Sequence, residues 1–225
     1  MNAIILAGPL ANFRSGCILD PSRNWVLYYP LVTHPKQFNS FQSAVLSALS
    51  VDSCSGDIGH DLHSKLVITL KSVSGRTHIP PGWQSQTFKH LGLCTSFVKM
   101  CWLKSVVGGW CTGVRLHSFH GRLCIFGCVD CKDDMLHYLE CTILWQIARE
   151  VLQVRESSIC ILERLCIVDP SEEKFVSLAF CHALYHACVN DTRCVRADGT
   201  PCCSQVVQLR AWELAHECKY MVGGT

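Results

Sequence analysis

The sequence predicts a mainly α-helical protein with an irregular N-terminal part. Apolar residues recur every three or four positions through most of the second half of the chain, the spacing of helices with one buried face. Of the 225 residues, 49% are apolar and 17% are charged, so the chain can bury enough apolar surface to fold. We expect an ill-defined segment over residues 1–80 and a helical region over residues 81–225.

The helical region begins after Pro80-Pro81-Gly82, which we take as the boundary because proline removes a backbone donor and restricts the residue before it. Residues 88–116 are expected to be mostly helical, with an interruption at Gly108-Gly109. Residues 135–154 show the clearest amphipathic pattern.

Two further helices are predicted near the C-terminus. Asp169-Pro170 is expected to cap a helix over residues 171–189, with Glu172 and Glu173 in its first turn to complement the helix dipole. The last helix is expected to run from a Ser204 cap to about Met221.

The N-terminal segment is weakly patterned. Residues 41–49 suit a short helix, and residues 52–61 are loop-like in composition. The run Val67-Ile68-Thr69-Leu70 fits either a strand or a buried helical turn.

Charge is unevenly distributed although the net charge is only +2. Between Leu62 and Val129 there are eight basic residues and no acidic one, interleaved with aromatic residues, whereas the next 44 residues, Asp130–Glu173, carry ten acidic and four basic residues. A basic segment of this kind suits a polyanion, because Lys and Arg neutralise phosphates. A solvated helix face explains the same pattern.

The 17 cysteines favour a reducing, intracellular compartment, nuclear or cytoplasmic, over a disulfide-stapled secreted module. The count is odd, and most cysteines lie among apolar residues, where they act as small hydrophobes. The apolar start at Ala3–Ala7 has no preceding Lys or Arg and breaks at Gly8-Pro9, which is unlike a secretory signal. No stretch is long and apolar enough for a membrane span, so we expect no membrane partner.

One group of residues has the spacing of a zinc site: Cys124, Cys128, His137 and Cys141. Two cysteines separated by three residues can close a tight turn around Gly127, and His137 and Cys141 would lie one turn apart on one helix face. Zinc prefers four such sulfur and nitrogen ligands in a tetrahedron. The prediction is a small helical domain with an embedded Cys-Cys-His-Cys knuckle.

Spacing leaves alternatives open. Cys131 could replace Cys124 as the partner of Cys128, and a set of Cys111, His117 and His120 lies just upstream. His182 and His186, four residues apart, could share a second metal ion, although helix histidines are more often satisfied within a core.

Three strings carry a resemblance to a known family: Gly109-Trp110-Cys111-Thr112-Gly113-Val114-Arg115, Cys124-Ile125-Phe126-Gly127-Cys128, and His137-Tyr138-Leu139-Glu140-Cys141. Over about residues 88–195 the chain resembles the C-terminal region of reverse transcriptases from non-LTR (LINE-type) retrotransposons, most closely dinoflagellate copies. The resemblance implies that Cys124, rather than Cys131, joins the zinc ligands. It also implies RNA or DNA as a partner. The basic residues that flank the knuckle on its N-terminal side would then make the phosphate contacts: Lys99, Lys104, Arg115 and Arg122.

The chain departs from that family where catalysis would reside. A polymerase holds two Mg²⁺ ions on adjacent aspartates after a strand, but the sole Asp-Asp pair, Asp133-Asp134, lies inside the expected zinc loop and follows Lys132. We therefore expect a non-catalytic zinc-knuckle fragment that binds nucleic acid. The alternatives are a decayed open reading frame without a selected function and a structural or protein-interaction module.

Overall fold

The computed structural model describes residues 56–70, 79–115, 123–154, 160–191, 193–194, 196 and 202–223, and the side chains from Leu62 onward. These residues belong to a compact unit that begins at Gly56. Its helices in chain order are α3 (Gly56–Leu70), α4 (Trp83–Leu93), α5 (Ser96–Val106), α6 (Met135–Glu140), α7 (Thr142–Leu152), α8 (Ile161–Arg164), α9 (Glu172–Asn190) and α10 (Ser204–Gly223). The prediction of a mainly helical protein is confirmed.

Helix α3 changes the expectation for the segment before residue 80. The loop predicted at 52–61 is wrong from Gly56 onward, and Val67–Leu70 form the last turn of the helix rather than a strand. Thr69 Oγ1 donates to the Val106 carbonyl at 3.1 Å, which ties α3 to the end of α5. The helix predicted at 41–49 lies outside the described residues, and the domain boundary after residue 80 stays a prediction.

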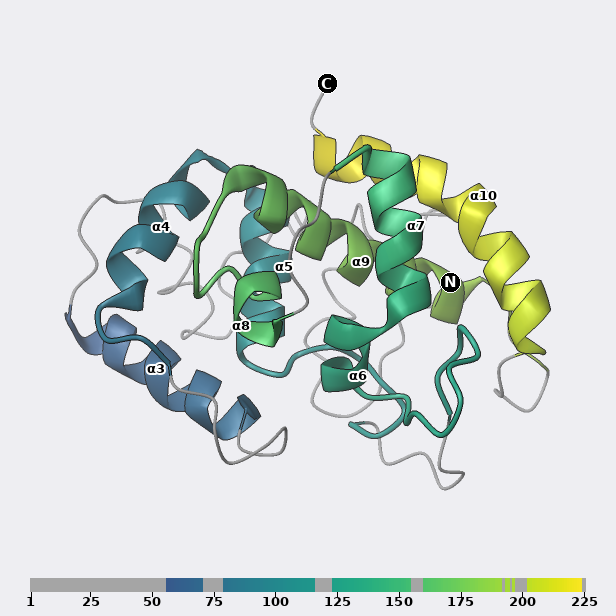
Figure 1. Ribbon diagram of the computed structural model, residues 1–225, viewed down its shortest axis with the longest axis horizontal. Helices are drawn as coiled ribbons and strands as arrows, with labels where there is room; N and C mark the ends of the chain where they lie inside the picture. Colours follow the sequence, from purple (N-terminus) through teal and green to yellow (C-terminus); the bar gives the residue numbers. More distant parts are fainter. Residues whose placement is uncertain are drawn as a thin grey trace, which may run out of the picture. The chain divides into compact units, whose positions relative to one another are not determined.

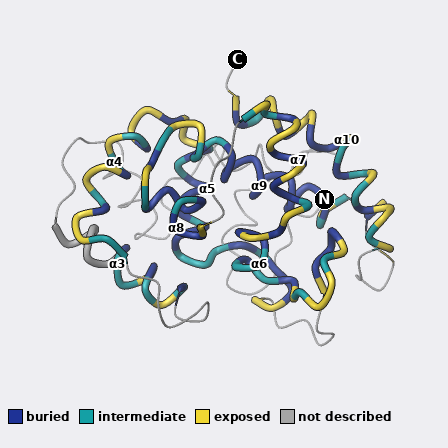
Figure 2. Tube along the Cα trace, in the orientation of Figure 1, coloured by how far each residue is buried: buried dark blue, intermediate teal, exposed yellow. Residues whose placement is uncertain are grey.

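Helix α9 forms the centre of this unit. It packs against α4, α5, α7, α8 and α10, and in Figure 1 it lies between α5 and α7. All residues from Ser177 to Cys188 are buried, so the tube in Figure 2 stays dark along this stretch. A helix that is buried on every side needs apolar or small residues on every side, which the sequence of α9 supplies.

Helices α4 and α5 are separated by a break that periodicity did not reveal. Thr95 caps α5 by accepting a hydrogen bond from Val98 N, so the stretch predicted as mostly helical divides at Cys94-Thr95. The Trp102 indole of α5 donates to the Leu165 carbonyl at 2.9 Å, and its ring packs edge-on against Phe175. Helix α5 is thereby fixed to both α9 and the turn that precedes it.

The cap of α9 lies two residues after the predicted one, and the helix itself begins one residue later than expected. Ser171 is the cap, since its side chain accepts a hydrogen bond from Lys174 N, and Asp169 and Pro170 both precede it. Asp169 lies instead in the left-handed region at φ 46° and pairs with the Lys174 ammonium at 2.6 Å. Glu172 occupies the first turn as expected.

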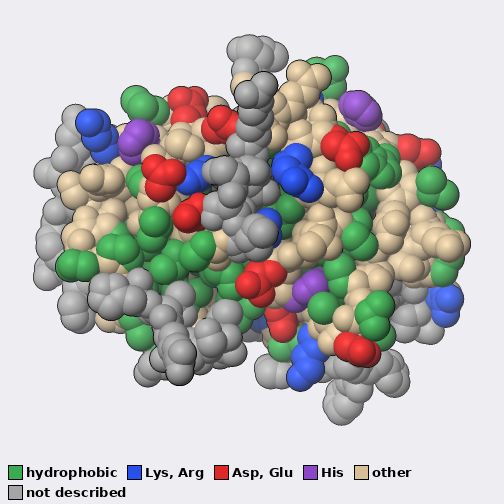
Figure 3. Space-filling model, in the orientation of Figure 1, with side chains coloured by type: hydrophobic (Ala, Val, Ile, Leu, Met, Phe, Trp, Pro, Cys, Tyr) green, Lys and Arg blue, Asp and Glu red, His purple; other side chains and the backbone are tan. Residues whose placement is uncertain are grey.

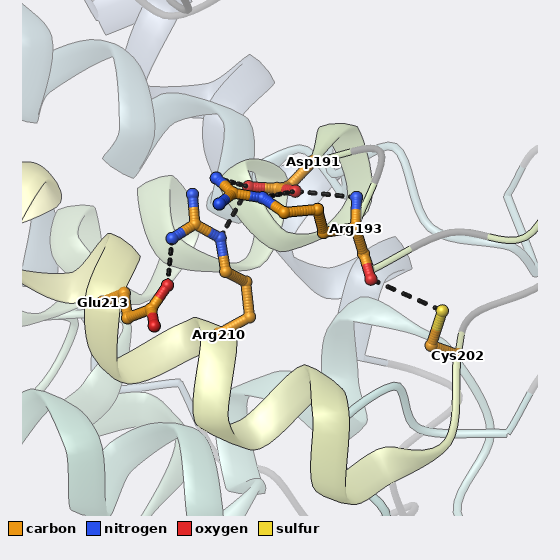
Figure 4. A network of polar contacts seen from close by, with 5 residues as sticks. All are labelled: Asp191, Arg193, Cys202, Arg210 and Glu213. Carbon is orange, nitrogen blue, oxygen red and sulfur yellow. Dashed lines mark hydrogen bonds and ion pairs between the residues drawn. The ribbon is translucent and has the colours of Figure 1, made fainter.

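A polar network joins the end of α9 to α10 (Figure 4). The Arg210 guanidinium of α10 bridges Asp191, at 2.9 Å, and Glu213. Arg193 also pairs with Asp191, and its carbonyl accepts a hydrogen bond from the Cys202 thiol at 3.5 Å. The two longest helices are therefore linked where the chain reverses direction.

No helix within the described residues combines the length and hydropathy that a membrane crossing requires.

Candidate metal centre

The first half of the predicted knuckle is a tight antiparallel turn. Leu123 and Lys132 form a β-bridge, and Cys124 N donates to the Cys131 carbonyl at 2.7 Å. Gly127 N donates to the Cys124 carbonyl at 3.0 Å, and Gly127 has φ 89°, which an L side chain rarely adopts. The glycine thus closes the turn that brings Cys124 and Cys128 to one side, as its place between them predicts.

The second half is helix α6 and the break that follows it. Asp134 caps α6 by accepting a hydrogen bond from His137 N at 2.7 Å. The single helix predicted over residues 135–154 is wrong at Cys141, whose ψ of 108° separates α6 from α7. Cys141 therefore lies at the junction of two helices and not one turn beyond His137 on a single helix.

These four side chains converge. One ligand atom from each of Cys124, Cys128, His137 and Cys141 lies within 4.8 Å of the other three. The Cys141 sulfur is 3.6 Å from that of Cys128 and 4.0 Å from that of Cys124. Sulfur atoms bound to one tetrahedral zinc ion are roughly 3.8 Å apart, given zinc–sulfur bonds of about 2.3 Å. The spacing of the cluster therefore fits a zinc-sized cation.

The histidine provides a second sign of fit. His137 Nε2 is buried, and it has no hydrogen-bond partner within the described part of the chain. A buried polar atom without a partner costs about 1–3 kcal/mol, so native proteins seldom leave one. A metal ion bound among the three sulfur atoms would satisfy this nitrogen.

The sulfur atoms shift one another's protonation. A hydrogen bond from the Cys141 thiol, with a further contribution from His137, lowers the pKa of Cys124 to about 4. Burial raises the pKa of Cys128 to about 11, and the hydrogen bond to Cys124 and burial raise that of Cys141. The cluster alone thus favours one thiolate, and a divalent cation would displace the remaining protons.

The alternative ligands do not join this group. Cys131 accepts the backbone hydrogen bond of Cys124, but the converging set contains Cys124 in its place, as the family resemblance implies. His117 and His120 lie outside the described residues. His182 and His186 lie against each other in α9, with ring centroids 4.4 Å apart and ring planes tilted by 53°, and no third potential ligand among the described residues completes a group with them.

A buried carboxylate anchors the knuckle to α9. Asp133, 1% exposed, accepts hydrogen bonds from the Tyr138 hydroxyl at 2.8 Å, the Tyr185 hydroxyl at 2.9 Å and Gly113 N at 2.9 Å. The Tyr138 hydroxyl in turn accepts from Ile125 N at 3.2 Å, inside the turn. The sequence pattern gave no indication of this network, because the residues of such a network are up to 72 positions apart and only the fold brings them together.

An arginine supports the end of α6. Arg164, 7% exposed, donates to the Leu139 carbonyl at 2.6 Å, and its guanidinium lies 4.4 Å from the centre of the Trp145 ring. The Trp145 indole donates to the Tyr138 carbonyl at 3.0 Å. Trp145, 3% exposed, is therefore part of the core, and its ring is not open to a base.

Helix α10 closes the other side of the turn. Gln208 donates a short hydrogen bond to the Phe126 carbonyl, and a Cβ atom added to Gly127 would lie 2.5 Å from the Ser204 Cβ. Gly127→Ala should thus reduce the free energy of unfolding by about 1–3 kcal/mol, because the methyl group adds a clash to an unfavourable φ. Urea unfolding would measure the change.

Gly92→Ala is the matched control for that substitution. Gly92 lies in α4, and a Cβ atom there would meet nothing within 4 Å. Alanine should stabilise this helix by about 0.5–1 kcal/mol. Equal effects at both positions would contradict the role assigned to Gly127.

The predicted phosphate-binding residues occupy different places. The Lys99 ammonium donates to the Gly92 carbonyl at 3.0 Å, whereas Lys104 lies five residues later in α5, about 140° around the helix. Lys104 and Arg115 are both hydrogen-bonded to Gly109. The Gly109 N–H donates to the Lys104 carbonyl, and the Gly109 carbonyl accepts a hydrogen bond from the Arg115 guanidinium at 2.6 Å. Arg122 lies outside the described residues.

Charges of both signs are interspersed on the face drawn in Figure 3, so no broad basic field covers it. Any anion site on this face must therefore come from particular side chains. Comparisons with known protein families, with curated proteins and with solved structures gave no match.

Proposed function

We propose that Cys124, Cys128, His137 and Cys141 bind one zinc ion that holds the knuckle together. The observation that carries this proposal is the convergence of three sulfur atoms around an imidazole whose buried Nε2 has no partner. Three soft sulfur ligands and one imidazole nitrogen favour zinc over the oxygen-preferring Mg²⁺ and Ca²⁺. All four positions come from the protein, so the zinc is structural and leaves no open position for a substrate.

The knuckle belongs, in this proposal, to a non-catalytic module that binds RNA or DNA and descends from a retrotransposon reverse transcriptase. The basic segment before the knuckle and the resemblance of its flanking strings support this function. The aspartates are consistent with it, since Asp133 is hydrogen-bonded in the core and Asp134 caps α6. Neither is placed as an open carboxylate that could hold catalytic Mg²⁺.

The zinc proposal is tested on protein purified under reducing conditions. We expect about one zinc ion per chain, measured by plasma emission spectrometry, and its loss in Cys124→Ser and His137→Ala. Cys131→Ser is the matched control, because Cys131 lies opposite Cys124 in the turn but outside the ligand set. It should keep its zinc.

Other outcomes separate the alternatives. Substoichiometric metal that ignores the ligand variants would overturn the zinc site and favour a reading frame without a selected function. Stoichiometric zinc without any binding of RNA or DNA would favour a structural or protein-interaction module. Nucleic-acid binding by the zinc protein should weaken linearly with the logarithm of salt concentration.

A further inference from the structure

A second group of cysteines lies where α9 ends and the chain turns back toward α10. Four follow one another closely in the sequence: Cys188, Cys194, Cys202 and Cys203. Cys188 and Cys194 are buried, with exposed fractions of 1% and 2%, whereas Cys202 is half-buried and Cys203 is exposed. All four are free thiols, and none of them belongs to the candidate zinc site.

The buried pair is brought together because the chain reverses directly after α9. Asp191 N donates to the Ala187 carbonyl at 2.9 Å at the end of the helix, and Cys194 N donates to the Asp191 carbonyl at 2.9 Å. The second bond closes a turn. Cys194 is also held from its other side, since its carbonyl accepts a hydrogen bond from Cys202 N at 2.8 Å. Cys194 is thereby folded back toward the last turn of α9, which carries Cys188.

The two thiols interact directly. A hydrogen bond joins the side chains of Cys188 and Cys194. This bond lowers the pKa of Cys194, whereas the same bond and burial raise the pKa of Cys188. Cys194 is therefore the more easily ionised of the two, and the thiolate is the form of cysteine that reacts with oxidants.

The surrounding contacts keep the pair in place. Helix α9 packs against five other helices, and Figure 4 shows the Asp191 carboxylate held by Arg193 and by Arg210 of α10, at 3.3 and 2.9 Å. The helix that carries Cys188 and the turn that carries Cys194 are thus both anchored. Two reactive groups held side by side react with each other far faster than with a group on another molecule.

We propose that Cys188 and Cys194 form a modification site that hydrogen peroxide converts into a reversible intramolecular disulfide. The Cys194 thiolate attacks one peroxide oxygen and the O–O bond breaks, which leaves Cys194 as a sulfenic acid. The departing hydroxide takes up the proton that Cys194 had lost and becomes water. The Cys188 sulfur then attacks the Cys194 sulfur, and the displaced hydroxyl leaves with the Cys188 proton as a second water. Two thiols are oxidised and one peroxide is reduced.

Burial favours a small oxidant at this site. Cys194 is almost fully buried, but the turn in front of it reaches the surface, since the Arg193 side chain is 65% exposed. Hydrogen peroxide is small and uncharged, whereas the disulfide of oxidised glutathione is carried by two charged tripeptides. The adjacent Cys188 also stops the oxidation of Cys194 at the disulfide, before the irreversible sulfinic acid forms.

Peptide mapping of the full, zinc-loaded chain tests the proposal. The protein is treated with hydrogen peroxide, its remaining thiols are alkylated, and it is digested with trypsin. Cleavage at Lys174, Arg193 and Arg196 places Cys188 and Cys194 in separate peptides, 175–193 and 194–196. We expect mass spectrometry to find these two peptides joined after peroxide, and separate again when dithiothreitol precedes the alkylation.

Three alanine variants identify the sulfur atoms. Cys188→Ala and Cys194→Ala should lose the link, whereas Cys181→Ala, which removes another buried thiol from peptide 175–193, should keep it. In Cys188→Ala the Cys194 sulfenic acid has no partner, so its labelling by dimedone, added with the denaturant, should rise about tenfold over the parent chain. Cys194→Ala should leave Cys188 unlabelled, because its thiol stays protonated. Circular dichroism checks the fold of each variant, and the map of the parent chain decides the pairing without them.

Three results would overturn the proposal. Peptide 175–193 joined instead to 197–210 or 211–219 would show a pairing with Cys202, Cys203 or Cys218. Full alkylation of Cys188 and Cys194, at a peroxide concentration that oxidises the exposed Cys160, would show that the buried pair does not react. Equal dimedone labelling of the Cys188→Ala and Cys194→Ala variants would contradict the order of the two steps.

Discussion

Asp133→Ala should destabilise the protein by about 3–5 kcal/mol, because it removes one acceptor from three buried donors. The hydroxyls of Tyr138 and Tyr185 and the N–H of Gly113 all bond to this carboxylate. A loss of this size is a large part of the stability of an ordinary domain, about 5–15 kcal/mol. Urea unfolding followed by circular dichroism measures it through the transition midpoint.

The neighbouring aspartate is the control for that substitution. Asp134→Ala removes the same charge one residue later but takes away only the cap of α6, which accepts from His137 N. It should cost about 1 kcal/mol. If the two variants are equally stable, Asp133 does not hold the knuckle to α9 in the way described.

The histidine pair in α9 should make the protein acid-sensitive. Burial lowers the pKa of His182 far below 6.5 and, together with nearby Lys104 and Arg115, lowers that of His186 to about 3. The unfolded chain takes up these protons below about pH 6.5, whereas the folded chain stays neutral. The contribution of this pair to the free energy of unfolding is therefore constant above pH 6.5, and it decreases as the pH drops toward 3. At pH 5 the loss from His186 is about 2 kcal/mol. His182 adds a loss in the same direction.

Unfolding free energies measured in urea between pH 7.5 and 5 test this slope. His182→Leu should flatten it, since its imidazole is buried and both ring nitrogens are without partners among the described residues. His216→Leu removes an exposed imidazole from α10 and should leave the slope as in the parent chain. Zinc measured at each pH separates this effect from loss of the metal. A slope that His182→Leu leaves unchanged would exclude the pair as its source.

Local signals in the sequence were enough to predict much of the helical part. Helix α9 was predicted from Asp169-Pro170 and the acidic residues that follow it, and α10 from a Ser204 cap. Gly127 follows from the need for a tight turn between two cysteines. The grouping of the four candidate ligands was also predicted, because all of them lie within 18 consecutive residues. Spacing alone could not decide whether Cys124 or Cys131 is the ligand. That choice depends on the side of the turn from which each sulfur atom projects.

Features that depend on distant contacts were missed. No Pro or Gly marks the break at Cys141 in the sequence. Two distant contacts lie there instead: the Trp145 indole donates to the Tyr138 carbonyl, and Arg164 donates to the Leu139 carbonyl. In the sequence Asp133 looks like an ordinary polar loop residue, because its partner Tyr185 lies 52 positions later and only the fold brings the two together.

The burial of α9 from Ser177 to Cys188 has a consequence for how the chain folds. Its neighbours α4 and α5 precede it by more than 60 residues, while α10 follows it, so contacts from both sides of the sequence must form before α9 is sheltered. A fragment that lacks either side would leave an apolar helix surface in water. The helices that surround α9 therefore depend on one another and share a single cooperative transition.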